Sequence, residues 1–211
     1  MPSDARQKMI ESAVVLLATR GLQGTAFSDV LERSGAPRGS IYHHFPDGKE
    51  QLVDAAIELA GDRALRVLDA VRDAPPKDVT GFFLDLWREV LVRSNLRAGC
   101  AVLAVTVATD SPDLLGHAAS IFRAWRGRLA ELYVTGGMPA SAAARLAVTV
   151  IAATEGAVVV SRAEQSLEPF EEVAKALLAM TPGVSSAAKG AKRAAKETKG
   201  SPRVRRRKAA Q

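Results

Sequence analysis

The sequence predicts an all-α protein of about nine helices, in which a three-helix N-terminal domain precedes a larger helical C-terminal domain. Apolar residues recur at helical spacing along most of the chain, and no segment shows strand-like alternation. Apolar residues make up 47% of the chain and aromatic residues only 5%. Alanine, leucine and valine dominate, which favours helices packed closely through small side chains. The length of 211 residues is enough to bury a substantial core.

Two short helices are predicted after a longer first one. The first helix is predicted over residues 4–20, and Gly21 closes it in the left-handed conformation that favours glycine. Ser28 is predicted to cap the second helix, which Gly35 and the following Ala-Pro stop. A third short helix is predicted over residues 38–45.

A long fourth helix follows and links the two domains. Asp47 and Glu50, three residues apart, resemble a capping box at its start, and Pro75-Pro76 ends it after about residue 72. In the C-terminal half, Ser111 followed by Pro112 is a typical helix start. The five helical segments predicted there cover residues 79–95, 100–108, 112–134, 140–165 and 168–180. The two domains are therefore predicted to span residues 4–64 and 75–181.

The basic charge of the chain is concentrated at its C-terminal end. From Pro182 onward the sequence holds ten Lys/Arg and one acidic residue, Glu197. The net charge of +6 thus divides into +9 for this tail and −3 for the rest. The composition of residues 182–211, rich in Ala, Lys, Arg, Gly and Ser, predicts disorder. Because the body is mildly acidic, nucleic-acid binding by the body depends on where particular residues lie.

Cysteine content and hydropathy predict a cytoplasmic protein. The single cysteine, Cys100, excludes an internal disulfide and fits a reducing compartment. No signal peptide is recognisable at the start of the sequence. The longest apolar stretch, residues 146–160, is interrupted by Glu155 and is too short to span a bilayer, so we interpret it as a buried helix.

The segment from Phe27 to Leu52 is typical of a helix-turn-helix, and it reads FSDVLERSGAPRGSIYHHFPDGKEQL. Burial of Ile41 and Phe45, four residues apart, leaves polar side chains of the second short helix on its other faces. The start of that helix offers backbone N–H groups suited to phosphate. There, Gly39 permits close approach of the backbone, and Arg38, Tyr42 and Lys49 are candidate DNA contacts.

This segment resembles the DNA-binding domain of the TetR/AcrR family of bacterial transcriptional regulators over roughly the first sixty residues. The matching residues are Gly21, Thr25, Phe27, Gly35, Gly39, Tyr42, His44, Phe45, Lys49 and Leu52. The resemblance implies an all-α homodimer with a C-terminal domain for ligand and dimer contacts. It also implies that Arg38, Ser40 and His43 lie near base edges. The resemblance further implies that five residues lie near DNA phosphates, namely Thr25, Gly39, Tyr42, His44 and Lys49.

A departure from the usual family spacing narrows this resemblance to one subgroup. Three residues, Pro46-Asp47-Gly48, separate Phe45 from Lys49, where the family usually has two. This form, together with the stretch Gly-Cys-Ala-Val-Leu-Ala at residues 99–104, is similar to the LmrA/YxaF-like drug-responsive repressors. The extra residue makes the phosphate role of Lys49 less secure than that of Tyr42.

The C-terminal domain is expected to bind a small apolar effector. Its candidate pocket residues are Phe83, Trp87, Cys100, Phe122 and Trp125, although helical spacing alone makes each of them equally suited to the core. Cys100 is interpreted as a buried apolar residue rather than a redox sensor. The last two long helices are expected to pair with those of a second copy, where Ala147, Ala153, Gly156 and Ala157 permit close approach.

The leading prediction is a repressor that binds a palindromic operator in the nucleoid, and two other functions are alternatives to it. No nucleophile elbow or glycine-rich phosphate loop is present, so we expect no enzyme activity. We expect no cofactor and no metal, because His43 and His44 lack further ligands at suitable spacing. The alternatives are a nucleoid-type protein whose binding depends on the basic tail, and a carrier of apolar ligands.

Overall fold

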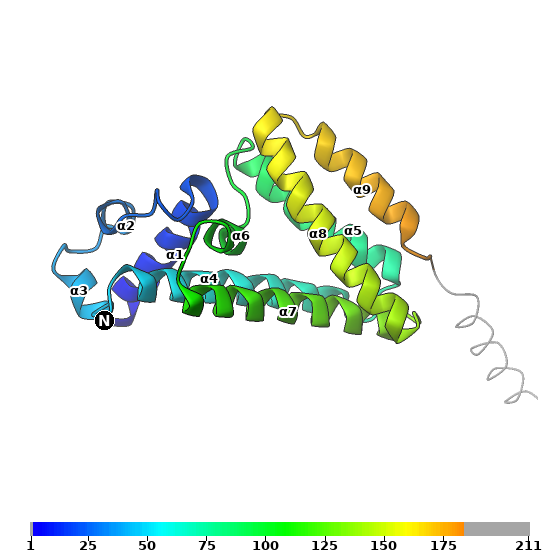
Figure 1. The fold of residues 1–211 in the computed structure, drawn as a ribbon, viewed down its shortest axis with the longest axis horizontal. Helices are drawn as coiled ribbons and strands as arrows, with labels where there is room; N and C mark the ends of the chain where they lie inside the picture. Colours follow the sequence, from blue (N-terminus) through cyan, green and yellow to red (C-terminus); the bar gives the residue numbers. More distant parts are fainter. Residues whose placement is uncertain (1, 184–211) are drawn as a thin grey trace, which may run out of the picture.

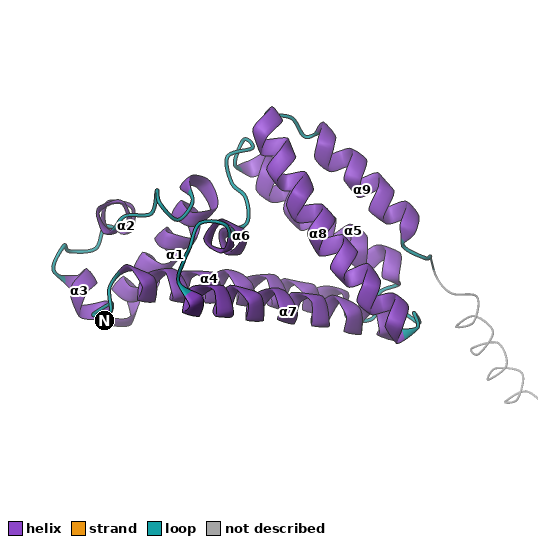
Figure 2. Ribbon diagram, in the orientation of Figure 1, coloured by secondary structure: helices purple, strands orange, loops and turns teal. Residues whose placement is uncertain are grey.

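The computed structural model describes residues 2–183, which form nine α-helices and one 3-10 turn without any strand in that range (Figures 1 and 2). The helices are α1 (Pro2–Arg20), α2 (Phe27–Ser34), α3 (Ser40–His44), α4 (Lys49–Leu68), α5 (Pro76–Arg93), α6 (Ala101–Thr106), α7 (Pro112–Thr135), α8 (Ala140–Glu164) and α9 (Glu168–Met180). The 3-10 turn η1 covers Asp69–Val71. The predicted all-α class is confirmed. The predicted tail, residues 182–211, lies outside the described residues except for its first two.

The helices are arranged along two long elements. In Figure 1, α4 and α7 run side by side along the length of the molecule, α1–α3 lie at one end, and α5, α8 and α9 lie at the other. The short helix α6 lies against α1, α4 and α7. A single apolar core runs through both halves, and α4 contributes to it at both ends through Leu52, Ile57 and Leu68. A movement of α4 relative to α7 would therefore also displace the N-terminal helices that pack against α4.

Glycine allows α4 and α7 to approach closely at the middle of their contact. A Cβ atom on Gly61 would lie 2.8 Å from Ile121 Cγ2, closer than side chains normally pack. Trp125 of α7 also donates its indole N–H to the Gly61 carbonyl oxygen at 3.1 Å, and this tryptophan is buried. The close approach and the hydrogen bond fix the register of the two helices.

Gly61→Ala is expected to lower the free energy of unfolding by about 1–2 kcal/mol, because overpacking at Ile121 outweighs the better helix propensity of alanine. Gly127→Ala in α7 is the matched control. A Cβ there meets no atom within 4 Å, so stability is expected to rise by up to about 1 kcal/mol. Urea unfolding of both variants measures the difference. A stabilising Gly61→Ala would contradict the close approach.

Several predicted helix starts are wrong by a few residues. Helix α2 begins at Phe27 with Ala26 at its N-cap, so Ser28 lies inside the first turn and caps nothing. Helix α4 has Gly48 at its N-cap, and Asp47 contributes its backbone N–H to the Gln51 side chain at 3.3 Å instead of capping through its carboxylate. In both cases a backbone turn sets the start of the helix.

Other helix ends follow the prolines and the caps. Pro76 is the first residue of α5 and starts that helix three residues earlier than predicted, because its missing N–H is not needed there. Ser111 caps α7 as predicted, since its hydroxyl accepts the Leu114 N–H at 3.5 Å. Cys100 caps α6, which is shorter at both ends than predicted.

Helix α8 combines a buried face with an exposed apolar face. By length and composition alone it could cross a membrane, but half of its most apolar window is buried inside the fold. Ala147 and Ala157 lie in the subunit core, so the expectation that they face a second copy is wrong. The exposed face instead carries small and branched apolar residues, namely Val148, Ala152, Gly156, Val159 and Val160.

Candidate nucleic-acid interface and ligand cavity

The helix-turn-helix is built on three fully buried apolar side chains. Val30 of α2, and Ile41 and Phe45 in and after α3, are each 0% exposed and belong to the core shared with α1 and α4. Gly35 ends α2 with φ of 68°, and its N–H donates to the Leu31 carbonyl oxygen at 3.0 Å. A left-handed residue is required at this point, which explains the glycine. The turn therefore holds α3 at a defined angle on the domain.

Helix α3 is shorter than predicted, with five residues instead of eight. Pro37, Arg38 and Gly39 form a turn in which both the backbone N–H and the hydroxyl of Ser40 donate to the Pro37 carbonyl oxygen, at 3.0 and 2.6 Å. The Ser40 N–H, at the start of the helix that was predicted to offer backbone N–H groups to phosphate, is therefore already hydrogen-bonded. Arg38 and Gly39 precede the helix instead of forming its first turn.

The outer side of this turn and of α3 is exposed and carries no acid. Arg38, Gly39, Tyr42 and His43 are exposed, and Tyr42 reaches 69%. The segment 36–45 contains one arginine, two histidines and no Asp or Glu. Tyr42 is held by an edge-to-face contact with Phe27, with ring centroids 5.8 Å apart. Such a surface presents hydrogen-bond donors to a polyanion without a repelling carboxylate.

The remaining predicted DNA contacts are less open. Thr25 is 1% exposed and donates its hydroxyl to the Gly21 carbonyl oxygen at 2.8 Å. Lys49 is partly buried, and its Nζ donates to the Leu22 carbonyl oxygen at 2.8 Å, so it ties α4 to the loop after α1. Ser40 and His44 are partly buried. Such side chains are suited to stabilising the exposed surface of α3 and the turn before it.

A cavity of about 420 Å³ lies between α1, α4, α5, α6 and α7. Four of the five predicted pocket residues line it: Phe83, Trp87, Cys100 and Trp125. Phe122 does not line this cavity. Its ring makes an edge-to-face contact with Trp125 at 5.4 Å and lines a separate groove between α6, α7 and α8.

Polar groups deep in this cavity are already occupied. Trp125 donates its N–H to Gly61, and the Cys100 sulfur accepts the Leu103 N–H at 3.4 Å. Burial, together with the nearby Glu155 carboxyl, raises the pKa of the Cys100 thiol well above its usual range, so the sulfur stays protonated and unreactive. The charged lining residues include Arg63 and Arg93, both of which are exposed. The cavity interior therefore favours an apolar molecule.

Sequence reasoning missed the part of the cavity wall that comes from the N-terminal domain. Val14 and Ala18 of α1 line it together with Ala60 and Ala64 of α4. Each pair is spaced by four residues, so each pair forms one small-residue helix face. That spacing was the available signal, but only the fold shows that the two faces meet.

The mid-helix acid Glu155 was also left without a role. It is 7% exposed, and no described group hydrogen-bonds to its Oε2 atom. Burial raises its pKa from 4.5 to about 7, and a hydrogen bond with Cys100 acts in the opposite direction. Within residues 2–183, no group of three His, Cys, Asp or Glu side chains is arranged to hold a metal ion.

Comparison with known sequences agrees with this geometry. Residues 9–63 match the family described as bacterial regulatory proteins, tetR family. Residues 76–176 match the C-terminal domain described as transcriptional regulator LmrA/YxaF-like. An uncharacterized HTH-type transcriptional regulator of Mycobacterium tuberculosis is 35% identical over 179 residues, which is 82% of this chain and 91% of that protein. The HTH-type transcriptional regulator LmrA of Bacillus subtilis is 25% identical, over 82% of this chain and 95% of LmrA.

Solved structures share the same fold. The regulatory protein TetR from Rhodobacter sphaeroides superposes with a TM-score of 0.76 at 22% identity, over 84% of this chain and 99% of that one. A TetR transcriptional regulator from Chloroflexus aurantiacus superposes with a TM-score of 0.70 at 29% identity, over 87% and 98% of the two chains.

Proposed function

This chain belongs to the TetR family of bacterial regulatory proteins, and on that premise we propose that it is a repressor that a small apolar effector releases from a palindromic operator. Members of the family are transcriptional regulators and not enzymes, and the helix-turn-helix is their DNA-binding part. The observation that carries the proposal is that segment 36–45 exposes Arg38, Tyr42 and His43, contains no acidic residue and is held on fully buried side chains. The protein would act in the cytoplasm, on DNA of the nucleoid.

Base reading is assigned to Arg38 and His43, with Ser40 beside them, and phosphate contact mainly to Tyr42 and Gly39. Thr25, His44 and Lys49 are assigned to holding this surface, because their side chains are buried or partly buried. Family members function as dimers. The exposed apolar face of α8 supports pairing of α8 and α9 with a second copy, which would set half-sites roughly 34–36 Å apart or a multiple of that distance.

The effector is assigned to the cavity between α1, α4, α5, α6 and α7. Because α1 and α4 form part of its wall, a molecule inside it would push directly on the helices that carry the helix-turn-helix. For release, the effector must bind the form that cannot bind DNA more tightly than the form that can. An apolar molecule of modest size fits the interior, whose polar groups are already paired.

Selection of bound sequences from a random DNA pool, at near-physiological salt, tests the regulatory proposal. The full chain and a chain lacking residues 182–211 are both expected to enrich the same palindrome. The nucleoid-type alternative, in which the +9 tail dominates, predicts featureless binding that is lost with the tail. The carrier alternative predicts no enrichment in either case.

Ala64→Phe is expected to make the protein insensitive to effectors while operator affinity stays within about twofold, because the new ring fills the cavity on the α4 side. Both tryptophans of the chain, Trp87 and Trp125, line the cavity, so intrinsic fluorescence reports occupancy. Apolar compounds that change the fluorescence of the native protein should have no effect on the variant. An unchanged response in Ala64→Phe would place the effector elsewhere.

A further inference from the structure

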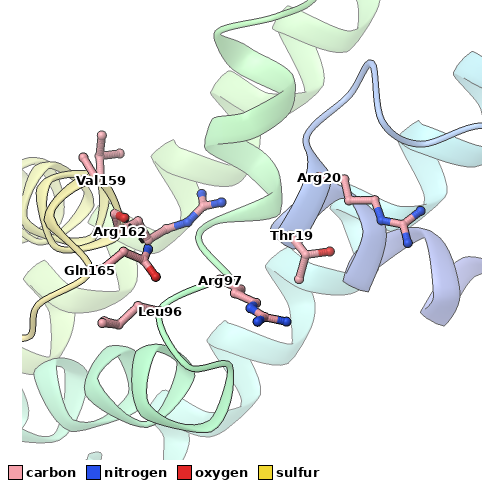
Figure 3. Close-up of a pocket in the computed structure, with 8 residues that line it drawn as sticks. Thr19, Arg20, Leu96, Arg97, Val159, Arg162 and Gln165 are labelled. Atoms are coloured by element: carbon pink, nitrogen blue, oxygen red, sulfur yellow. Dashed lines mark hydrogen bonds between the residues drawn. The ribbon is translucent and has the colours of Figure 1, made fainter.

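A second cleft, unrelated to the apolar cavity, lies where the N-terminal domain meets the end of α8. It has a volume of about 690 Å³ and is formed by the end of α1, the loop between α5 and α6, and the last turns of α8 (Figure 3). Its walls carry three arginines, one from each of these segments: Arg20, Arg97 and Arg162. No Asp or Glu occurs among the described residues that line it. The proposed regulatory function assigns no role to this cleft.

Two of the three guanidinium groups have no partner within the part of the chain that the structure describes. Arg20 is paired with Asp29, with Nη1 3.1 Å from Oδ1, and in Figure 3 its side chain extends away from the other two. Arg97 and Arg162 extend toward the α1 side of the cleft, where Thr19 lies (Figure 3). Within residues 2–183, neither Arg97 nor Arg162 forms an ion pair or a side-chain hydrogen bond. In a body with a net charge of −3, two arginines that line one cleft without an acidic partner among the described residues are a marked local excess of positive charge.

Arg162 packs against the loop that precedes α6. It is partly buried, and it lies so close over Gly99 that a Cβ atom on Gly99 would be 2.8 Å from Arg162 Nη1 and 3.6 Å from its Cζ. Gly99 in turn donates its N–H to the Ala18 carbonyl oxygen of α1 at 2.8 Å. The glycine thus leaves room for the Arg162 guanidinium beside a loop that is hydrogen-bonded to α1.

We propose that this cleft binds a small anion carrying carboxylate or phosphate groups, held between Arg97 and Arg162. Planar guanidinium groups donate paired hydrogen bonds to such oxygens, and two of them together can chelate one anion. An anion bound there would fasten the end of α8 to the loop that is hydrogen-bonded to α1. The site would thus favour the observed arrangement of the two domains, by an amount set by anion concentration.

Titration of the full-length protein with citrate and, separately, with inorganic phosphate tests the site, using calorimetry at constant ionic strength with chloride as the balancing salt. The native protein is expected to bind one anion per chain in a saturable manner, and the two titrations distinguish a carboxylate from a phosphate ligand. The double variant Arg97→Gln/Arg162→Gln is expected to bind at least ~10-fold more weakly, because two charge-assisted contacts are removed. Arg145→Gln removes an exposed arginine on the same helix, outside the cleft, and is expected to change nothing.

Gly99→Ala provides a test that leaves the charge unchanged. Its new methyl group would displace the Arg162 guanidinium, so binding is expected to weaken although every arginine remains. The basic tail is present in all variants, so its own anion binding cancels in the comparison. The proposal is overturned if neither anion saturates, or if the double variant binds as tightly as the native protein. Operator selection, carried out without these anions, separates this outcome from a failure of the repressor proposal.

Discussion

Replacement of Tyr42 by alanine is expected to lower affinity for the selected operator by about 10- to 100-fold for each half-site contacted, with no loss of thermal stability. The side chain is 69% exposed, so its removal leaves the core intact. A hydrogen bond from its hydroxyl to a phosphate oxygen involves a charged acceptor and contributes roughly 1.5–3 kcal/mol, which corresponds to that range of affinity. Fluorescence anisotropy with labelled operator, at fixed salt, gives the affinities.

Tyr42→Phe separates the two contributions of this side chain. The phenylalanine ring retains the edge-to-face contact with Phe27 but lacks the hydroxyl, so it should lose most of the affinity that alanine loses. Full affinity in Tyr42→Phe, together with loss in Tyr42→Ala, would show that the ring only supports the surface. Native affinity in both variants would show that Tyr42 does not contribute to DNA binding.

Glu155→Gln is expected to stabilise the protein at pH 8 by about 3 kcal/mol and to leave it nearly unchanged at pH 4.5. Burial raises the pKa of Glu155 to about 7 in the folded state, from 4.5. The folded state therefore favours the protonated acid, and this contribution to stability is complete below about pH 4.5 and is lost as the pH rises through about 7. Each unit of pKa difference corresponds to about 1.4 kcal/mol. Glutamine has the same shape and cannot ionise.

Urea unfolding at pH 4.5 and pH 8, at one protein concentration, measures this effect. Glu164→Gln, at the exposed end of the same helix, is the control and should follow the native pH dependence. A native protein as stable at pH 8 as at pH 4.5, relative to Glu155→Gln, would mean that the carboxylate finds a partner in solution. A second copy paired on the α8 face is one source of such a partner.

The sequence predicted best those features that depend on neighbours along the chain. Ser111 caps α7 because its hydroxyl reaches an N–H three residues away, and Gly35 ends α2 through a local left-handed turn. Ser28 and Asp47 carry equally good capping side chains, yet the backbone starts each helix elsewhere. Residue type alone does not decide between such neighbouring positions, and this explains the shifted boundaries.

Features that depend on packing between segments far apart in the sequence could not be predicted from the sequence alone. Phe122 and Trp125 are three residues apart on α7, yet they line different sites. Trp125 lines the apolar cavity, and Phe122 lines the groove beside α8, so the packing of the helices decides between the two. Arg97 and Arg162 lie 65 positions apart and line the same cleft because the loop after α5 and the end of α8 converge. The exposure of the candidate DNA contacts Arg38, Tyr42 and His43 was predictable because the motif is contiguous, but the burial of Thr25 was not.

The contribution of α1 and α4 to the wall of the apolar cavity limits how this protein can be recombined. A chimaera that joins residues 4–64 to another C-terminal domain would carry Val14, Ala18, Ala60 and Ala64 with it, and so a share of the cavity that we propose binds the effector. On that proposal, operator specificity and effector specificity could not be transferred independently of each other. In biosensor engineering, exchange of the DNA-binding half alone would alter the range of compounds detected.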